Sequence, residues 1–424
     1  MPDSNTHIHD FNRRLLLMCI MGCILHALIA GICSIPPQSD ALDYHEHGLR
    51  LAETHGYTVN GIPTAYRPIG FPAALSIAYM ISPHIISGFI LQSLLVSITA
   101  YCIGLILVEC GVSKKKSLFA SGIYLLLPMT WLQSMTLMSE PLAICAMMLS
   151  INIRFTYHSH LARGLEGLLW GIAILARPVM VFCVIGIVIH DLLSKSRSFA
   201  QIGIYLTCTL LTLMPWVIRN AYVMGSPVIA SNTGINLYIG NNAHANGSYK
   251  VMPDMNVFDS LPEMQANALG ISKAIAYVTE NPLQSLIMIP KKIAYLFSSD
   301  AYLPLQLIQT DAMSYRERLM QLPAWTIVLL IPGCILMFFG MSYVSIFRSI
   351  HQQSHIFVIL FCMILPCMIF FGSARYHEPM IPFMLIAAVS GYERNGNFIG
   401  PMKVLPIALA LLWSIEFVMV FLHM

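Results

Sequence analysis

Residues 39–72 read SDALDYHEHGLRLAETHGYTVNGIPTAYRPIGFP, the only long polar run in the first third of an otherwise apolar chain. The run directly follows an apolar segment, so we expect it to lie at a membrane surface. It gathers acids, histidines and arginines: Asp40, Asp43, Glu46, Glu53, His45, His47, His55, Arg50 and Arg67. So many titratable groups beside a first membrane span indicate catalysis or ligand binding, with a solvated first loop as the alternative.

Composition predicts a membrane protein made of many helices. Of 424 residues, 57% are hydrophobic and 10% are charged, whereas soluble domains carry about 25% charged residues. A bilayer core of about 30 Å needs about 20 apolar residues per helix, and long unbroken apolar runs indicate helices rather than a barrel. The net charge of +3 is small and scattered, and no basic tract indicates nucleic-acid binding. The 11 cysteines lie mostly inside apolar runs, as small core residues do.

The apolar runs predict an all-α polytopic fold with about eleven transmembrane helices. The expected spans lie near residues 14–33, 85–108, 117–131, 136–153, 164–176, 179–189, 199–217, 323–344, 356–371, 380–390 and 405–422. One further apolar stretch, residues 69–81, is short for a span and suits a re-entrant helix or a helix lying at the membrane surface. We therefore expect a single transmembrane domain over residues 1–424.

The distribution of lysine and arginine in short loops predicts the orientation. If residues 69–81 do not cross, the basic residues flanking the spans fall inside: Arg13, Arg14, Lys114–Lys116, Arg154, Arg163, Lys195, Arg197, Arg348, Arg394 and Lys403. The first loop, residues 34–84, and the long segment, residues 219–321, then fall outside. This pattern fits a bacterial inner membrane with the site facing the periplasm, and an endoplasmic reticulum membrane stays open.

The long external segment contains a stretch that could contact lipid. A helical stretch over residues 262–280 ends at Asn281-Pro282. Residues 283–297 are amphipathic and carry Lys291 and Lys292, which could reach lipid phosphates. A plain covering helix is the alternative.

Four charged residues are predicted at external span ends, on the same face as Asp40: Glu140, Arg177, Arg219 and Arg375. Ionisable groups at membrane depth are costly and usually functional, although each could instead extend to the membrane interface. Arginines beside carboxylates suit an anionic lipid phosphate. His377, near Arg375, could contact the same phosphate or cap a loop.

Several motifs occur in a fixed order along most of the chain. They are Asp40-x-x-x-Tyr44, Tyr66-Arg-Pro-Ile-Gly-Phe-Pro72, Ser139-Glu-Pro141, Ala176-Arg-Pro178, Pro215-Trp-x-x-Arg-Asn220, Thr233-Gly-Ile-Asn-Leu-Tyr-Ile-Gly-Asn-Asn242 and Arg375-Tyr-His-x-Pro379. This ordered set resembles the GT-C glycosyltransferases, in the branch of protein O-mannosyltransferase-like and aminoarabinose-transferase-like enzymes.

The resemblance implies a GT-C-like bundle with external juxtamembrane helices in the first loop. It implies a polyprenyl-phosphate-linked sugar as donor and an inverting transfer outside the cytoplasmic membrane. By motif position, Asp40 matches the essential first-loop aspartate, with Asp43 as the second choice. Arg67, Arg219 and Arg375 match arginines near the lipid phosphate. Gly48 departs from the pattern, since alanine is common there, and the chain has no large soluble domain at its end, so acceptor recognition is unassigned.

The residue types suit this chemistry. An inverting transfer needs a carboxylate to take a proton from the acceptor, and fixed cations stabilise the charge that develops on the leaving phosphate. The resemblance implies an acceptor that could be a lipid, a glycan or a protein. His45 and His47 beside Asp43 are candidate ligands for a divalent metal ion, although residues two apart do not share a helical face.

Three other functions stay open. A secondary transporter would show inverted repeats and ionisable groups near mid-membrane, whereas here the charges gather at span ends and no repeat is visible. A polysaccharide ligase or polymerase would depend on late-loop residues such as Arg316 and Arg318. A non-catalytic scaffold would tolerate substitutions at all of these positions.

Overall fold

The computed structural model describes residues 4–54, 56–300, 326–344, 354–397 and 403–421. Within these ranges the chain is helical, apart from a two-stranded hairpin of β1 (Thr58–Val59) and β2 (Ile62–Pro63). The predicted all-α class is therefore confirmed. The end of the predicted long segment, the start of the span near residue 323, Arg316, Arg318 and Arg348 lie outside the described residues.

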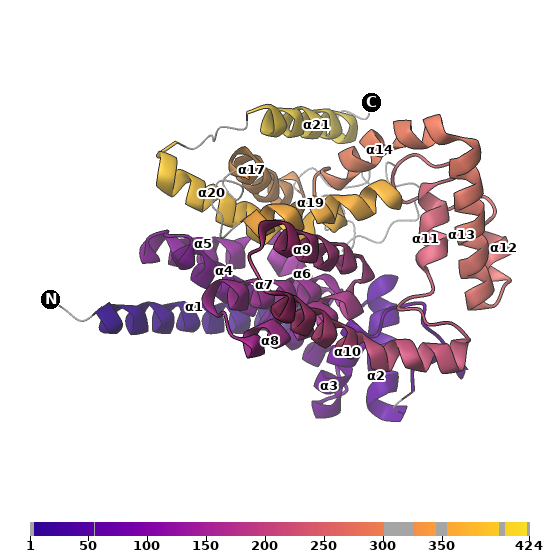
Figure 1. Cartoon of the computed structure of the whole chain (residues 1–424), viewed down its shortest axis with the longest axis horizontal. Helices are drawn as coiled ribbons and strands as arrows, with labels where there is room; N and C mark the ends of the chain where they lie inside the picture. Colours follow the sequence, from indigo (N-terminus) through magenta and orange to yellow (C-terminus); the bar gives the residue numbers. More distant parts are fainter. Residues whose placement is uncertain (1–3, 55, 301–325, 345–353, 398–402, 422–424) are drawn as a thin grey trace.

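The first half of the chain forms most of the bundle (Figure 1). Its helices are α1 (Ser4–Cys33), α2 (Asp40–Thr54), α3 (Gly70–Ile81), α4 (Ile85–Glu109), α5 (Lys114–Leu126), α6 (Pro128–Met135), α7 (Glu140–Thr156), α8 (His160–Ala176), the short 3-10 helix η1 (Pro178–Met180), α9 (Val181–Ser194) and α10 (Phe199–Met224).

The second half begins outside the bundle and returns to it. Its helices are α11 (Thr233–Gly240), α12 (Met255–Asp259), α13 (Glu263–Glu280), α14 (Pro282–Leu296), α17 (Ile327–Tyr343), α19 (Ser354–Ile369), the 3-10 helix η4 (Ala374–Met380), α20 (Ile381–Asn395) and α21 (Val404–Phe421). In Figure 1, α11, α12 and α13 lie together at the edge opposite the marked amino terminus.

Three of the described helices are long and apolar enough to cross a membrane: Asp10–Cys33, Ile85–Glu109 and Phe199–Met224. The pair α5 and α6 passes the same test together but is bent by 52°, as in a broken span or a re-entrant loop. Several shorter apolar helices accompany them, so the protein is a multi-pass membrane protein. The total of about eleven spans stays a prediction.

The region of the span predicted over residues 117–131 is made of two helices, α5 and α6, that meet at a bend. Leu127 has an extended backbone, with φ −63° and ψ 133°, and it directly precedes Pro128. The proline ring disfavours helical geometry for the residue before it. The helix therefore stops at Leu126 and restarts at Pro128 with a new direction.

The short helix α3 packs against α2. Its 12 residues correspond to about 18 Å at 1.5 Å per residue, which is less than a bilayer core. Phe71, Leu75 and Tyr79 of α3 are buried in a cluster with Tyr44 of α2. The first loop therefore contains two helices that pack together, and their juxtamembrane position stays a prediction.

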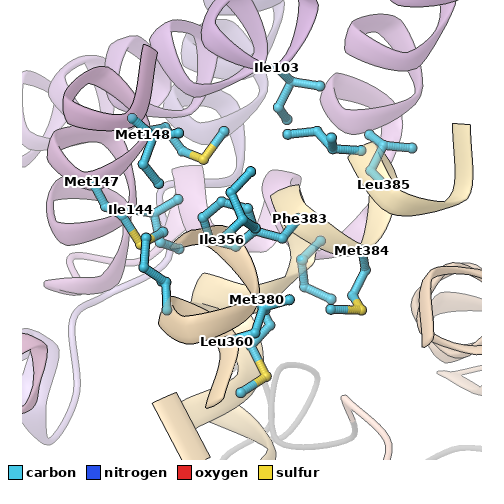
Figure 2. Close-up of a cluster of buried hydrophobic side chains, with 14 of the residues drawn as sticks. Ile103, Ile144, Met147, Met148, Ile356, Leu360, Met380, Phe383, Met384 and Leu385 are labelled. Carbon is cyan, nitrogen blue, oxygen red and sulfur yellow. The ribbon is translucent and has the colours of Figure 1, made fainter. Parts of the chain in front are cut away.

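A hydrophobic core joins the two halves of the chain (Figure 2). It combines side chains from α4, α7, α19, η4 and α20: Ile103, Ile144, Met147, Met148, Ile356, Leu360, Met380, Phe383, Met384 and Leu385. Because α7 and η4 share this core, residues near position 140 and near position 375 are held together. On the outside, α1 exposes large apolar side chains such as Met21 and Leu28, as a helix facing lipid does.

Candidate functional site

Two carboxylates stand in the first turn of α2, where the helix N-terminus favours negative charge. Asp40 and Asp43 are three positions apart and therefore share a face of the helix. Both contact Arg67: its Nη2 lies 2.7 Å from Asp40 Oδ1 and 2.7 Å from Asp43 Oδ2, and its Nε lies 2.9 Å from Asp43 Oδ2. One guanidinium thus binds both aspartates.

A tight hairpin brings Arg67 back to the start of α2. Strands β1 and β2 pair in antiparallel fashion around Asn60 and Gly61, whose φ angles are 51° and 79°. Positive φ at both central residues is typical of a type I′ turn, for which Asn-Gly is the preferred sequence. The Asn-Gly pair in the sequence is the signal that could have predicted this hairpin. After the turn the chain reverses, and Arg67 lies 24 positions after Asp43 in sequence.

A second arginine reaches Asp40 from the far end of the chain. Arg375 in η4 donates from Nη1 to Asp40 Oδ2 at 2.7 Å and also forms an ion pair with Glu140. Glu140 is the first residue of α7, and it pairs in addition with Arg177, the residue that ends α8. The guanidinium of Arg177 lies 5.4 Å from the centre of the Tyr376 ring.

These contacts define the ionic cluster: Asp40, Asp43, Glu140, Arg67, Arg177 and Arg375. Three carboxylates face three guanidinium groups, so the cluster is formally neutral. Solvent exposure decreases across the cluster: the exposed fraction of the side chain is 45% at Asp43, 31% at Asp40 and 1% at Glu140. Asp40 therefore lies at the boundary between the buried pairs and solvent.

The arginines keep Asp40 ionised. Burial by itself raises the pKa of this carboxyl, but Arg375 and Arg67 together outweigh that effect and lower the pKa from 3.8 to about 2. The same pairing raises the pKa of the Arg67 guanidinium, although burial opposes it. Asp40 therefore carries its negative charge throughout the physiological pH range.

Tyr44 closes the buried side of the cluster. Its ring is buried, makes an edge contact with Phe71 at 5.4 Å between centroids, and lies 5.8 Å from the Arg67 guanidinium. Its hydroxyl donates to Ser139 Oγ at 3.3 Å, and Ser139 Oγ in turn lies 3.4 Å from Glu140 Oε2. The residue predicted beside Asp40 thus packs between α2 and the start of α7.

The structure places Arg219 in a different environment. Its Nη1 donates to the backbone carbonyl of Thr64 at 2.7 Å, and its Nη2 donates to the carbonyl of Tyr57 at 2.8 Å. Its guanidinium also lies 5.0 Å from the centre of the Trp216 ring. These contacts tie Arg219 to the hairpin that precedes Arg67, not to the carboxylates of the ionic cluster.

Three other predicted site residues also lie apart from the ionic cluster. Lys291 is exposed on α14, whereas Lys292 is buried and donates to Asn241 Oδ1 at 3.0 Å and to the carbonyl of Met368 at 3.2 Å. His377 is buried, with Nδ1 2.6 Å from the Leu296 carbonyl and Nε2 2.7 Å from Asp300 Oδ1. Lys292 therefore joins α14 to the ends of α11 and α19, whereas His377 joins η4 to the end of α14 and the residues after it.

The two histidines considered as metal ligands face different neighbours. His45 Nδ1 lies 2.7 Å from the Tyr79 hydroxyl, whereas the ring of His47 stacks on Tyr57 at 4.4 Å. Over the described part of the chain, no three His, Cys, Asp or Glu side chains gather in a way that could hold a metal ion.

The structure also reveals polar residues that the sequence did not single out. Glu263, at the start of α13, bonds to Thr64 and Ala65 just before Arg67. Gln133 donates to the buried Glu378 at 2.5 Å. Neither pairing has a local signal in the sequence, because the partners lie 199 and 245 positions apart.

Comparisons with known proteins return matches among solved structures alone: no family model matches the chain, and no curated protein matches it significantly. One match is the crystal structure of ArnT from Cupriavidus metallidurans bound to undecaprenyl phosphate, with 11% identity, 87% of this chain and 77% of that chain covered, and a TM-score of 0.43. Another is the Archaeoglobus fulgidus oligosaccharyltransferase tethered with an acceptor peptide, with 12% identity, 94% and 53% covered, and a TM-score of 0.44.

Proposed function

We propose that this protein is a membrane glycosyltransferase that moves a sugar from a polyprenyl-phosphate donor to an acceptor on the external face of the membrane. The observation that carries the proposal is the position of the Asp40 carboxylate between Arg67 and Arg375, each at 2.7 Å, at the start of the first loop. A partly exposed base beside fixed cations is what such a transfer needs. We propose a bacterial inner membrane with the site on the periplasmic side.

Asp40 is the proposed general base, and Arg67 and Arg375 are the proposed ligands of the lipid phosphate. Both oxygens of Asp40 are occupied by these arginines. A phosphate that binds the same two guanidinium groups would compete with the carboxylate and release an oxygen to accept a proton. Arginine suits this role because its planar donors bind phosphate as readily as carboxylate. Asp43 holds Arg67 in place and is the second candidate for the base.

The proposed reaction is an inverting displacement. The acceptor oxygen or nitrogen attacks the anomeric carbon of the sugar from the side opposite the phosphate, and its proton passes to Asp40. The new bond to the anomeric carbon forms as the bond from that carbon to the phosphate oxygen breaks. The electron pair stays on the polyprenyl phosphate, whose charge Arg67 and Arg375 stabilise. The identity of the sugar and the identity of the acceptor, whether lipid, glycan or protein, are to be determined by experiment.

The decisive experiment uses Asp40→Asn in cells that otherwise lack the protein. Mass spectrometry of polyprenyl-phosphate sugars and of envelope glycans reads the outcome. We expect the variant to fold and to lower transfer by about 10²- to 10⁴-fold, which is the usual contribution of a general base, so that one lipid-linked sugar accumulates and is thereby identified.

Glu46→Gln on the same helix is the matched control, because the Glu46 side chain is 52% exposed and lies outside the ionic cluster. Full transfer by Asp40→Asn would move the base to Asp43 or Glu140. No change in any lipid-linked sugar when the whole protein is removed would refute the proposed function.

A further inference from the structure

The loop that carries Arg67 is bound by an acidic residue, Glu263, that lies 199 positions after Thr64 in the sequence. Glu263 Oε2 accepts a hydrogen bond from the Thr64 hydroxyl at 2.7 Å, and Glu263 Oε1 accepts one from the Ala65 backbone N–H at 2.8 Å. Ser231 also donates to Oε1, and its own backbone N–H donates to the Ala65 carbonyl at 2.9 Å. One carboxylate thus joins the first loop to α13 and to the chain before α11.

The contact continues toward Arg67. The Thr64 hydroxyl that donates to Glu263 also accepts the Tyr66 backbone N–H at 3.0 Å. Thr64 and Ala65 are 3% and 0% exposed, so water cannot replace these bonds. Leaving such buried polar groups unpaired is unfavourable. The orientation of the residue directly before Arg67 therefore depends on Glu263.

Arg219 of α10 holds the same segment from another side. It binds the carbonyls of Thr64 and Tyr57, and the Tyr57 hydroxyl donates to the Arg67 carbonyl at 3.0 Å. The hairpin between them has strands of two residues each, and such a short hairpin is not stable alone. Residues 57–67 thus keep their shape through the side chains that hold them.

We propose that Glu263 is a positioning residue that holds residues 57–67 so that Arg67 stays on Asp40 and Asp43, and that it thereby sets the affinity of the site for a lipid phosphate. The part of the proposal that concerns lipid affinity rests on the proposed function. Arg219 is assigned the complementary structural role, in place of the phosphate contact that its motif suggested.

The first test needs no ligand. Hydrogen–deuterium exchange is measured on the peptide spanning residues 57–67 in the full chain in nanodiscs. We expect Glu263→Ala to speed exchange of the Ala65 and Tyr66 amides by about tenfold or more, as loss of a hydrogen bond to a charged group allows. Thr64→Val, a milder change of similar shape, should speed exchange at Tyr66. Glu280→Ala, an exposed glutamate at the other end of α13, is the matched control and should change neither amide.

The second test is a double-mutant cycle on the binding of undecaprenyl phosphate, the probe ligand. We expect Glu263→Ala to weaken binding about tenfold when Arg67 is present and to have no further effect in an Arg67→Ala background, because the residue acts through that arginine. A residue that only stabilises the fold would weaken binding equally in both backgrounds.

The outcomes separate the two proposals. Unchanged exchange in Glu263→Ala, or equal losses of affinity in both backgrounds, would overturn the role of Glu263 and leave the proposed function standing. If the wild type does not bind undecaprenyl phosphate, or if Arg67→Ala does not weaken binding, the result counts against the proposed function and against the affinity role of Glu263. Hydrogen–deuterium exchange would still decide whether Glu263 holds residues 57–67.

Discussion

Asp40 accepts a hydrogen bond on each carboxylate oxygen, and the two donors come from residues 67 and 375. The sequence predicted that Glu140, Arg177, Arg219 and Arg375 reach the same face of the membrane as Asp40, with Tyr44 and Arg67 as further site candidates. The structure gathers all of these residues except Arg219 around Asp40. Arg219 was predicted from the same ordered set of motifs, but it binds backbone carbonyls instead of a carboxylate. A motif specifies the residue type and its position in the sequence. The hydrogen-bond partner of a long side chain depends in addition on which acceptors the tertiary structure brings within reach.

The first prediction concerns the pH dependence of Asp40. The pKa of Asp40 is lowered from 3.8 to about 2, so the side chain stays ionised as the pH falls. Protonation of Asp40 should therefore not lower kcat/KM until the pH falls below about 4. Arg67→Gln removes one of the cations that lower the pKa, so the acid limb of kcat/KM should move upward by about one pH unit. Arg14→Gln, at an exposed position on α1, is the control. An unshifted acid limb in Arg67→Gln would assign the base to another group.

The second prediction concerns the buried end of the ionic cluster. Glu140→Gln keeps the shape of the side chain but leaves Arg177 and Arg375 beside a neutral amide. Removing one partner from a buried ion pair destabilises a protein by about 3–5 kcal/mol, so thermal unfolding in detergent should show a clearly lowered Tm. Glu46→Gln breaks an exposed pair with Arg50 and should change stability by no more than about 1 kcal/mol. Equal Tm values for the two variants would contradict the buried pairing.

At the scale of elements, α2 and α3 form the platform on which the ionic cluster is built. Gly48 of α2 faces α3, and a Cβ built there would lie 2.8 Å from Leu75 Cβ and 3.1 Å from Tyr79 Cε2. The absence of a side chain at Gly48 therefore lets the two helices approach closely. This contact gives a packing reason for the departure from the alanine that is common at this place in the family pattern.

The third prediction follows from this packing. Gly48→Ala should separate α2 from α3 and lower stability by about 1–3 kcal/mol, the usual range for overpacking, with a matching loss of transfer because Asp40 moves with α2. The control is Gly31→Ala in α1, where a Cβ would meet nothing within 4 Å and where alanine favours the helix by up to about 1 kcal/mol. The two variants are compared by thermal unfolding and by their sugar-transfer activity. A Gly48→Ala protein that is as stable as the Gly31→Ala protein would rule out the close contact between α2 and α3.

At the scale of the whole molecule, two polar ends enclose an apolar middle. The hairpin of α7 and α8 has the Glu140–Arg177 pair at one end and the Arg154–Glu166 pair at the other. Arg154 lies 14 positions after Glu140, which corresponds to about 21 Å along a helix at 1.5 Å per residue. Elsewhere Lys116 pairs with Glu393, and Arg394 donates to the Cys110 carbonyl. The basic residues after α4 therefore contact the end of α20, and the cytoplasmic position expected for both stays a prediction.

The fourth prediction concerns topology. A reporter fused after Lys116 should be cytoplasmic, because α3 is too short to cross and α1 and α4 then place this loop inside. A cysteine introduced at Glu53, which is exposed on α2, should react from outside with a membrane-impermeant reagent. An external reporter after Lys116 would invert the orientation and place the ionic cluster in the cytoplasm.

The sequence alone determined the helical membrane class and the residue types of the site, because hydrophobic run length and charge placement are local properties of the chain. The tertiary structure alone decided which arginines meet Asp40, why Arg219 does not, and that Glu263 holds the loop before Arg67. Such pairings join residues as many as 335 positions apart, and they depend on how α2, α7, α13 and η4 pack, which no local pattern encodes.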